Sequence, residues 1–143
     1  MSDPANECTD GGMTFLRPAG WVPPRGYANG VIAQGRIIVL AGQIGWDPAS
    51  CRMETDDFAE QAGLALRNIA TLLAEADAEP RHLVRLTWFI TDRAAYLASR
   101  SELGTIYRAH LGAHFPAMSV VVVSALIEER ALVEIEAMAV LPA

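Results

Sequence analysis

The chain has 143 residues, the size of one domain with its own hydrophobic core. Hydrophobic residues make up 52% of it and charged residues 20%, a balance that excludes a disordered or fibrous chain. Seventeen acidic residues against eleven basic ones give a net charge of −6, which argues against nucleic-acid binding. All eleven basic residues are arginine, so Schiff-base catalysis by a lysine side chain is excluded.

Residues 1–26 are expected to form an irregular leader, because proline and glycine interrupt positions 18–26 too densely for a helix or a central strand. The first residues are polar and acidic, unlike a signal peptide, and no apolar run approaches the ~20 residues of a membrane helix. The two cysteines, Cys8 and Cys51, do not make a disulfide scaffold, which favours a reducing compartment. We therefore expect a cytoplasmic protein with one domain over residues 27–143.

Regular structure is predicted to start with two apolar, β-branched runs. These runs, residues 27–33 and 36–41, are separated by Gln34-Gly35, which favours a hairpin. A long helix follows from about Asp57 to Ala76, since its apolar residues recur at three- and four-residue spacings.

The second half of the chain is predicted to contain three strands and one helix. Residues 82–90 are rich in large apolar side chains and indicate a strand, after which Asp92 begins a helix that ends near Gly112. Residues 117–123 include four consecutive valines, which predicts a strand buried on both faces. Residues 132–140 alternate between apolar side chains and Glu134, Glu136 and Met138, which predicts a strand with one buried face.

These elements give the order β-β-α-β-α-β-β, an α+β fold with two helices packed on one face of a mixed sheet. Two helices do not cover the second face of such a sheet, so a strand buried on both faces needs a further cover. Another copy of the chain is the obvious candidate. We therefore expect a homo-oligomer whose sheets pack together.

Few side chains stand out as candidates for chemistry. Glu134 and Glu136 point the same way from one strand, ~7 Å apart. They are either a solvated strand face or, at a subunit cleft, a carboxylate that orients water or accepts a proton. Tyr27, Trp46 and Trp88 are either core aromatics or walls of a binding site.

No metal or cofactor motif is complete. His110 and His114 have the spacing of two ligands on a helix, but Gly112 lies between them and a third ligand is missing. Gly42 and Gly45 lack the third glycine and the following helix of a dinucleotide site. We therefore expect neither a metal nor a cofactor.

Several segments together resemble the Rid family of reactive intermediate deaminases, also called YjgF or endoribonuclease L-PSP. They keep the family's order and spacing from about residue 27 to residue 140. The segments are Gly26-Tyr27, Ala41-Gly42-Gln43, Gln61 with Asn68-Ile69, Phe115-Pro116-Ala117 and Val133-Glu134-Ile135-Glu136-Ala137. The resemblance implies a chorismate-mutase-like fold and a homotrimer with ligand clefts between its subunits. It also implies hydrolysis of reactive imines and enamines to ketoacids and ammonia, without cofactor or metal.

The chain departs from the family at three positions. Two of them are Gly104, where the resemblance implies an asparagine in the second helix, and Val120, where it implies a cysteine. The resemblance implies an arginine directly after Pro-Ala that binds the substrate carboxylate, and Met118 stands there. Because a charge-assisted hydrogen bond contributes ~1.5–3 kcal/mol, this change should weaken carboxylate binding at least about tenfold. Methionine offers an apolar wall that suits a ring or hydrocarbon instead. The chain therefore resembles an arginine-less branch, for which 2-aminoacrylate is not expected to be a good substrate.

The leading hypothesis is a cofactor-free, homotrimeric hydrolase or deaminase that acts on a small imine or enamine. Glu134 would orient water and transfer a proton. The expected substrate-binding residues are Tyr27, Arg25, Gln43, Trp46, Trp88, Ala117 and Met118. The alternative is a non-catalytic trimer that binds a small metabolite or regulates a partner enzyme. Ribonuclease action is a third hypothesis, against which the acidic composition argues; neither nucleic acid nor membrane is an expected partner.

Overall fold

The structure, a computed structural model, describes residues 9–10 and 12–143; Cys8 lies outside the described residues. The main sheet has four strands in the order β4-β9-β7-β8. Their bounds are β4 Arg36–Ile44, β7 Leu83–Ile90, β8 Ala117–Val122 and β9 Val133–Leu141. β7 and β8 are parallel and the other pairs are antiparallel, so the sheet is mixed, as predicted.

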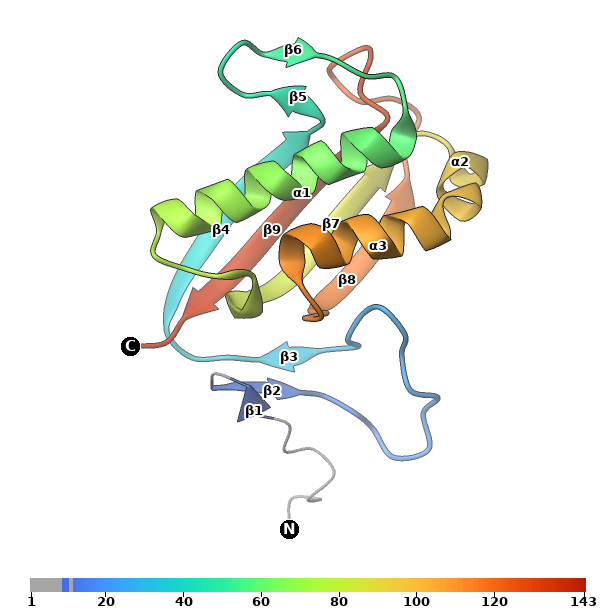
Figure 1. Cartoon of the computed structure of the whole chain (residues 1–143). Helices are drawn as coiled ribbons and strands as arrows, with labels where there is room; N and C mark the ends of the chain where they lie inside the picture. The colour runs from blue at the N-terminus through green and yellow to red at the C-terminus, as the bar shows by residue number, and fades with distance from the viewer. Residues whose placement is uncertain (1–8, 11) are drawn as a thin grey trace.

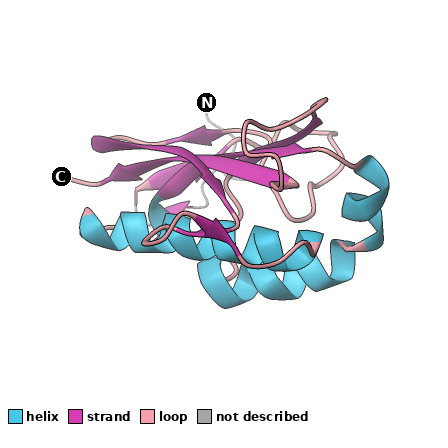
Figure 2. Ribbon diagram, turned by 90° about the horizontal axis from the view of Figure 1, so that it is seen from above, coloured by secondary structure: helices cyan, strands magenta, loops and turns pink. Residues whose placement is uncertain are grey.

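The long helices pack on one face of this sheet, which confirms the predicted α+β architecture (Figures 1 and 2). α1 (Phe58–Glu75) begins after Asp57, whose side chain accepts the Glu60 N–H at 2.9 Å. The second predicted helix is divided into α2 (Arg93–Ala98) and α3 (Arg100–Leu111). The division falls at Ser99, which ends α2 and begins α3 with φ −98° and ψ 5°.

A fully buried amide, that of Gln61, fixes α1 to the segments that precede α1 and β9. The Gln61 Nε2 donates to the Thr55 and Arg130 carbonyls at 3.0 Å each, and its Oε1 accepts the Leu132 N–H at 2.8 Å. α1 also passes very close to Gly45, where a Cβ would lie 2.5 Å from the Cα of Gln61. These contacts determine where β9 begins.

The two faces of the sheet differ in what covers them. On the helix side, Leu86 is paired with Ala137 and Trp88 with Ile135, and all four side chains are buried in the core. The opposite face carries no helix (Figure 2). We call it the open sheet face; its residues include Ile37, Val39, Arg85, Thr87, Phe89, Ser119, Val121, Glu134, Glu136 and Met138. Ile37 and Val39 are 67% and 70% exposed there, so this face presents apolar surface.

The prediction that the valine-rich strand is buried on both faces is wrong for the single chain. β8 is an edge strand, and Val121 and Val122 are 41% and 54% exposed. Apart from an isolated bridge between Ala28 and Ala117, only β7 pairs with β8 among the described residues, so most of its outer edge is unpaired. The valine pattern indicates burial that one copy of the chain does not supply.

The predicted hairpin between residues 27–33 and 36–41 is also wrong. β3 (Val31–Ile32) is paired with β2 (Met13–Phe15), whereas β4 is paired with β9. At Gly35 (φ +150°) a Cβ would lie 2.2 Å from the Leu141 carbonyl oxygen, so the chain passes directly beside the end of β9 and turns onto it there.

The expected leader is not entirely irregular. β1 (Thr9–Asp10) and β2 form a small three-stranded sheet with β3, and Met13 is buried. The remaining short elements are β5 (Trp46–Asp47), β6 (Arg52–Met53) and the 3₁₀ turn η2 (Pro80–His82). In the described part of the chain, no helix has both the length and the apolar character to cross a membrane.

Candidate functional site

Glu134 lies on the open sheet face, directly over Gly42. A Cβ at position 42 would be 2.0 Å from the Oε1 of Glu134 and 2.7 Å from its Cδ. The register of β4 on β9 shifts between Leu40 and Gln43, so this contact lies at an irregularity of the ladder. Only glycine leaves room for the half-buried carboxylate in this position.

Gln43 and Trp46 lie away from the cavity that contains most of the other predicted residues. The Gln43 side chain donates to the Ala41 carbonyl at 3.1 Å, a local bond beside Gly42. Trp46 packs against a small separate cluster with Ile44 and Met53. The structure therefore places Gln43 near the carboxylate, whereas Trp46 is a half-buried aromatic that packs on a separate cluster.

Four of the predicted residues meet in a cavity of about 400 Å³ between α3, β8 and the segment around Gly26. We call it the α3–β8 cavity; it includes Arg25, Tyr27, Trp88 and Met118. Its volume lies within the usual range for small-molecule sites. Ala117 does not line it, but positions one wall, because Ala28 bridges to Ala117 and donates to the Pro116 carbonyl at 2.9 Å.

Sequence reasoning missed two cationic residues of this cavity. Arg100 and Arg108 both line it from α3, with Gly104 between them on the same face of the helix. Where the side chain of residue 104 would be, the Arg108 guanidinium approaches instead, 3.4 Å from the place of a Cβ. The i, i+4, i+8 spacing is the signal that could have identified them.

Two aromatic residues of the cavity have different hydrogen-bond states. Tyr107 donates its hydroxyl to the His114 carbonyl at 2.6 Å and stacks on Phe115. Burial raises the pKa of the Tyr107 phenol, so it stays neutral. Trp88 is 4% exposed, and its indole Nε1 has no hydrogen-bond partner.

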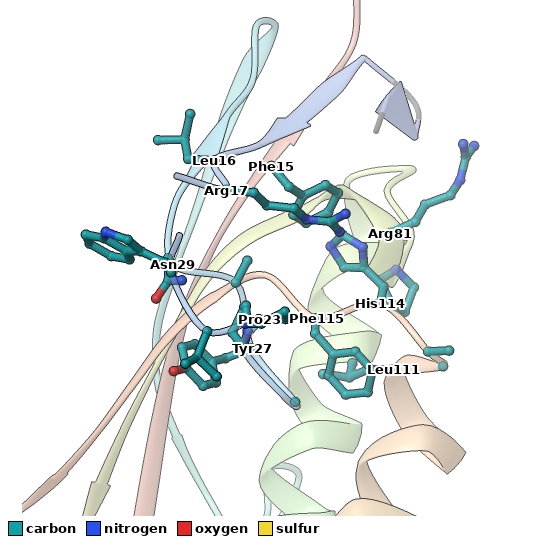
Figure 3. Close-up of a pocket in the computed structure, with 18 of the residues that line it drawn as sticks. Phe15, Leu16, Arg17, Pro23, Tyr27, Asn29, Arg81, Leu111, His114 and Phe115 are labelled. Carbon is teal, nitrogen blue, oxygen red and sulfur yellow. The ribbon is translucent and has the colours of Figure 1, made fainter. Parts of the chain in front are cut away.

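A larger cavity of about 1030 Å³ shares Tyr27 and Phe115 with the α3–β8 cavity. Figure 3 shows the residues that line the larger cavity, with Tyr27 and Phe115 among them. At its far end the Phe15 ring meets His114 edge-on at 6.0 Å, and Arg17 lies 5.9 Å from the Phe15 centroid. This cavity was not predicted, because one of its walls is the segment expected to be an irregular leader.

His110 and His114, for which no metal is expected, have separate surroundings. The His114 Nε2 lies 2.7 Å from the Leu83 carbonyl oxygen and is engaged there. Burial, followed by the nearby Arg67 charge, lowers the pKa of His110. Within residues 9–10 and 12–143, no group of three or more His, Cys, Asp or Glu side chains is placed to hold a metal ion.

The carboxylate and the α3–β8 cavity lie on opposite faces of the sheet. Met118 is paired with Leu86 and packs against the core, on the helix side. Glu134 is paired with Phe89, whose side chain points to the open sheet face. A reaction site that uses both groups therefore cannot form within one chain.

Comparison with known proteins identifies the family. The family described as Endoribonuclease L-PSP matches residues 21–141, so the match includes part of the expected leader. Human 2-iminobutanoate/2-iminopropanoate deaminase is 31% identical over 114 residues, covering 80% of this chain and 79% of that protein.

Solved structures agree with this match. The Rid-family protein YyfB of Yersinia pestis, of unknown function, has a TM-score of 0.77 at 29% identity, over 90% of this chain and 98% of that one. Escherichia coli TdcF, solved with bound serine, has a TM-score of 0.65 at 29% identity, over 85% and 91% of the two chains. The chain therefore belongs to the Endoribonuclease L-PSP family, the Rid or YjgF family that its motifs resemble.

Proposed function

We propose that the protein hydrolyses a small reactive imine or enamine to a carbonyl compound and ammonia. Water adds to the imine carbon to give a carbinolamine, and the C–N bond then breaks as nitrogen leaves as ammonia. An enamine first takes a proton on carbon to become the imine. The observation that carries the proposal is the Glu134 carboxylate lodged over Gly42. The deaminase activity named for the human relative supports the same reaction class.

Glu134 is the proposed catalytic residue. Its carboxylate accepts a proton as water attacks and returns that proton to the departing nitrogen, which is general acid–base catalysis. Tyr27, Trp88 and Met118 form the walls that hold the substrate. No step in this sequence requires a metal or a redox cofactor.

We also propose that the active form is a homotrimer with its sites between subunits. Exposed apolar side chains on the open sheet face, including Ile37 and Val39, favour burial against another copy. The separation of Glu134 from the α3–β8 cavity favours a site shared by two copies. Sedimentation at micromolar concentration should give about three times the chain mass. Val39→Asp should shift the sedimenting mass towards that of the dimer or the monomer. A folded wild-type monomer would contradict the proposed trimer.

The function is tested by ammonia release from imines generated freshly in the assay. Wild-type protein is expected to accelerate ammonia and ketone or ketoacid formation in equal amounts over the buffer rate. Because Met118 is apolar, imines with larger apolar groups should react faster than 2-aminoacrylate. If ammonia release with the protein were no faster than in buffer alone for every imine tested, the result would contradict the proposed function.

The second candidate is a non-catalytic protein that binds a small metabolite. It is favoured by Met118, which stands where the resemblance implies an arginine. Thermal unfolding in the presence of metabolites distinguishes the two, because a ligand of the folded state raises the unfolding temperature without any turnover. A stabilising carbonyl or imine compound that is never converted would support this second function.

A further inference from the structure

We propose that Arg108 and the indole N–H of Trp88 bind the substrate carboxylate in the α3–β8 cavity. The substrate would then be a 2-imino acid with an aromatic or bulky apolar side chain. This inference rests on the proposed function and specifies its substrate class. It assigns carboxylate recognition to α3 and β7 although Met118 offers no charge.

The charge of the cavity favours an anion. Arg25, Arg100 and Arg108 line it, and none of its lining residues is aspartate or glutamate, although the whole chain carries a net charge of −6. None of these three arginines forms a salt bridge with another described residue. A carboxylate is the group that guanidinium donors recognise with the best geometry.

Arg108 is exposed to solvent, and its guanidinium nevertheless lies at the cavity. Its guanidinium approaches the free side of Gly104 and lies 6.0 Å from the centroid of the Phe115 ring. Phe115 itself stacks on Tyr107, whose ring centroid is 5.1 Å away. The stacked rings of Phe115 and Tyr107 and the space beside Gly104 therefore hold the Arg108 guanidinium where a ligand in the cavity would contact it.

Trp88 supplies an independent observation. Its side chain is buried and lines the cavity, yet its Nε1–H is unpaired, which is costly for a buried donor. The arginines cannot satisfy this donor, because a guanidinium has no acceptor. An oxygen of a bound carboxylate accepts from the indole and the guanidinium together.

The remaining lining indicates the size of the substrate. Tyr96, Tyr107, Phe115, Met118 and Val120 give the cavity a mainly aromatic and apolar wall. The side chain of a 2-imino acid made from alanine would leave most of the volume of about 400 Å³ unfilled. A ring or a branched hydrocarbon fills this space and is favoured by the hydrophobic effect.

Binding of phenylpyruvate, the 2-keto acid product of such a reaction, tests the inference without turnover. Calorimetry with the full chain should show phenylpyruvate binding at least tenfold more tightly than pyruvate. It should also bind more tightly than 1-phenyl-2-propanone, which has a methyl group in place of the carboxylate. Arg108→Gln should weaken phenylpyruvate binding about tenfold or more, yet leave binding of the neutral ketone unchanged.

Two further variants complete the test. Trp88→Phe keeps an aromatic ring but removes the donor, and should weaken phenylpyruvate severalfold. Arg93→Gln, an exposed arginine of α2 outside the cavity, is the matched control and should bind as wild type does. The same variants are assayed for ammonia release from the imine of phenylalanine, generated by an amino-acid oxidase; Arg108→Gln should raise KM more than it lowers kcat.

The outcomes separate the inference from the function. One outcome is that the wild-type protein releases ammonia but Arg108→Gln, Trp88→Phe and Arg93→Gln all bind phenylpyruvate equally well. That outcome would overturn the inference and leave the proposed function standing. Pyruvate binding as tight as phenylpyruvate would overturn the substrate class. Carboxylate binding that depends on Arg108 without release of ammonia from any imine would instead overturn the proposed function.

Discussion

Replacing Gly42 by alanine is expected to lower ammonia release by about 10²-fold with little loss of stability. The new Cβ would lie 2.0 Å from the Oε1 of Glu134, so the carboxylate must move. Because the group displaced is the far end of a flexible side chain, the backbone keeps its place. Initial rates and thermal unfolding of the same samples measure the two effects.

The rate loss on replacing the Glu134 carboxylate itself is the reference for the rate loss expected in Gly42→Ala. Glu134→Gln should lower the rate by about 10²–10⁴-fold, since the amide neither accepts nor returns the proton. Glu136→Gln is the matched control, because it removes a carboxylate from the same strand and the same open sheet face. Wild-type rates in Gly42→Ala, or equal losses in the Glu134 and Glu136 variants, would contradict the assigned role.

Mixed assemblies test whether the site is shared. Glu134→Gln and Gly104→Leu, which fills the cavity side, should each be inactive alone. If each site takes its carboxylate from one copy and its cavity from a neighbour, random co-assembly restores about a quarter of the wild-type rate. No recovery in co-purified mixed assemblies would contradict a site shared between two copies.

The sequence pattern predicted correctly the helix and the strand whose buried faces are visible within their own segments. The helix predicted over residues 57–76 agrees with α1 at both ends, because a 3.6-residue apolar stripe and a capping carboxylate are encoded within the segment. The alternation in residues 132–140 likewise identified the buried face of β9. The hairpin prediction was wrong because β4 is paired with β9, about a hundred residues later, and adjacency in sequence carries no information on that partner.

The site was predictable where a motif marked it. Tyr27 and Met118, which the family motifs mark, line one cavity together with Arg25. Of the two tryptophans chosen only as aromatics, Trp88 also lines it, whereas Trp46 belongs to a separate cluster. The arginines of α3 were missed, because an arginine on an exposed helix face is ordinarily solvated. Their role depends on what faces them across the fold, and the sequence of α3 alone does not contain it.

Gln61→Leu is expected to lower the free energy of unfolding by about 3–5 kcal/mol, the largest stability effect that the fold predicts. The change removes partners from three backbone groups, at Thr55, Arg130 and Leu132. Each buried group left unpaired costs about 1–3 kcal/mol, and relaxation of the loops recovers part of the sum. Chemical denaturation at one fixed protein concentration measures the loss, because assembly adds to apparent stability.

Two companion variants make this prediction specific. Gln43→Leu removes only the local bond to the Ala41 carbonyl and should cost less than about 1 kcal/mol. Gln61→Glu keeps the acceptor for the Leu132 N–H but faces the two carbonyls with a buried carboxylate, which raises its pKa above the unfolded value of about 4.3. Protonation then favours the folded state, so the deficit of this variant should shrink as the pH falls from about 7 to about 5. A deficit independent of pH, or a leucine variant as stable as wild type, would show that the amide does not fix the start of β9 that carries Glu134.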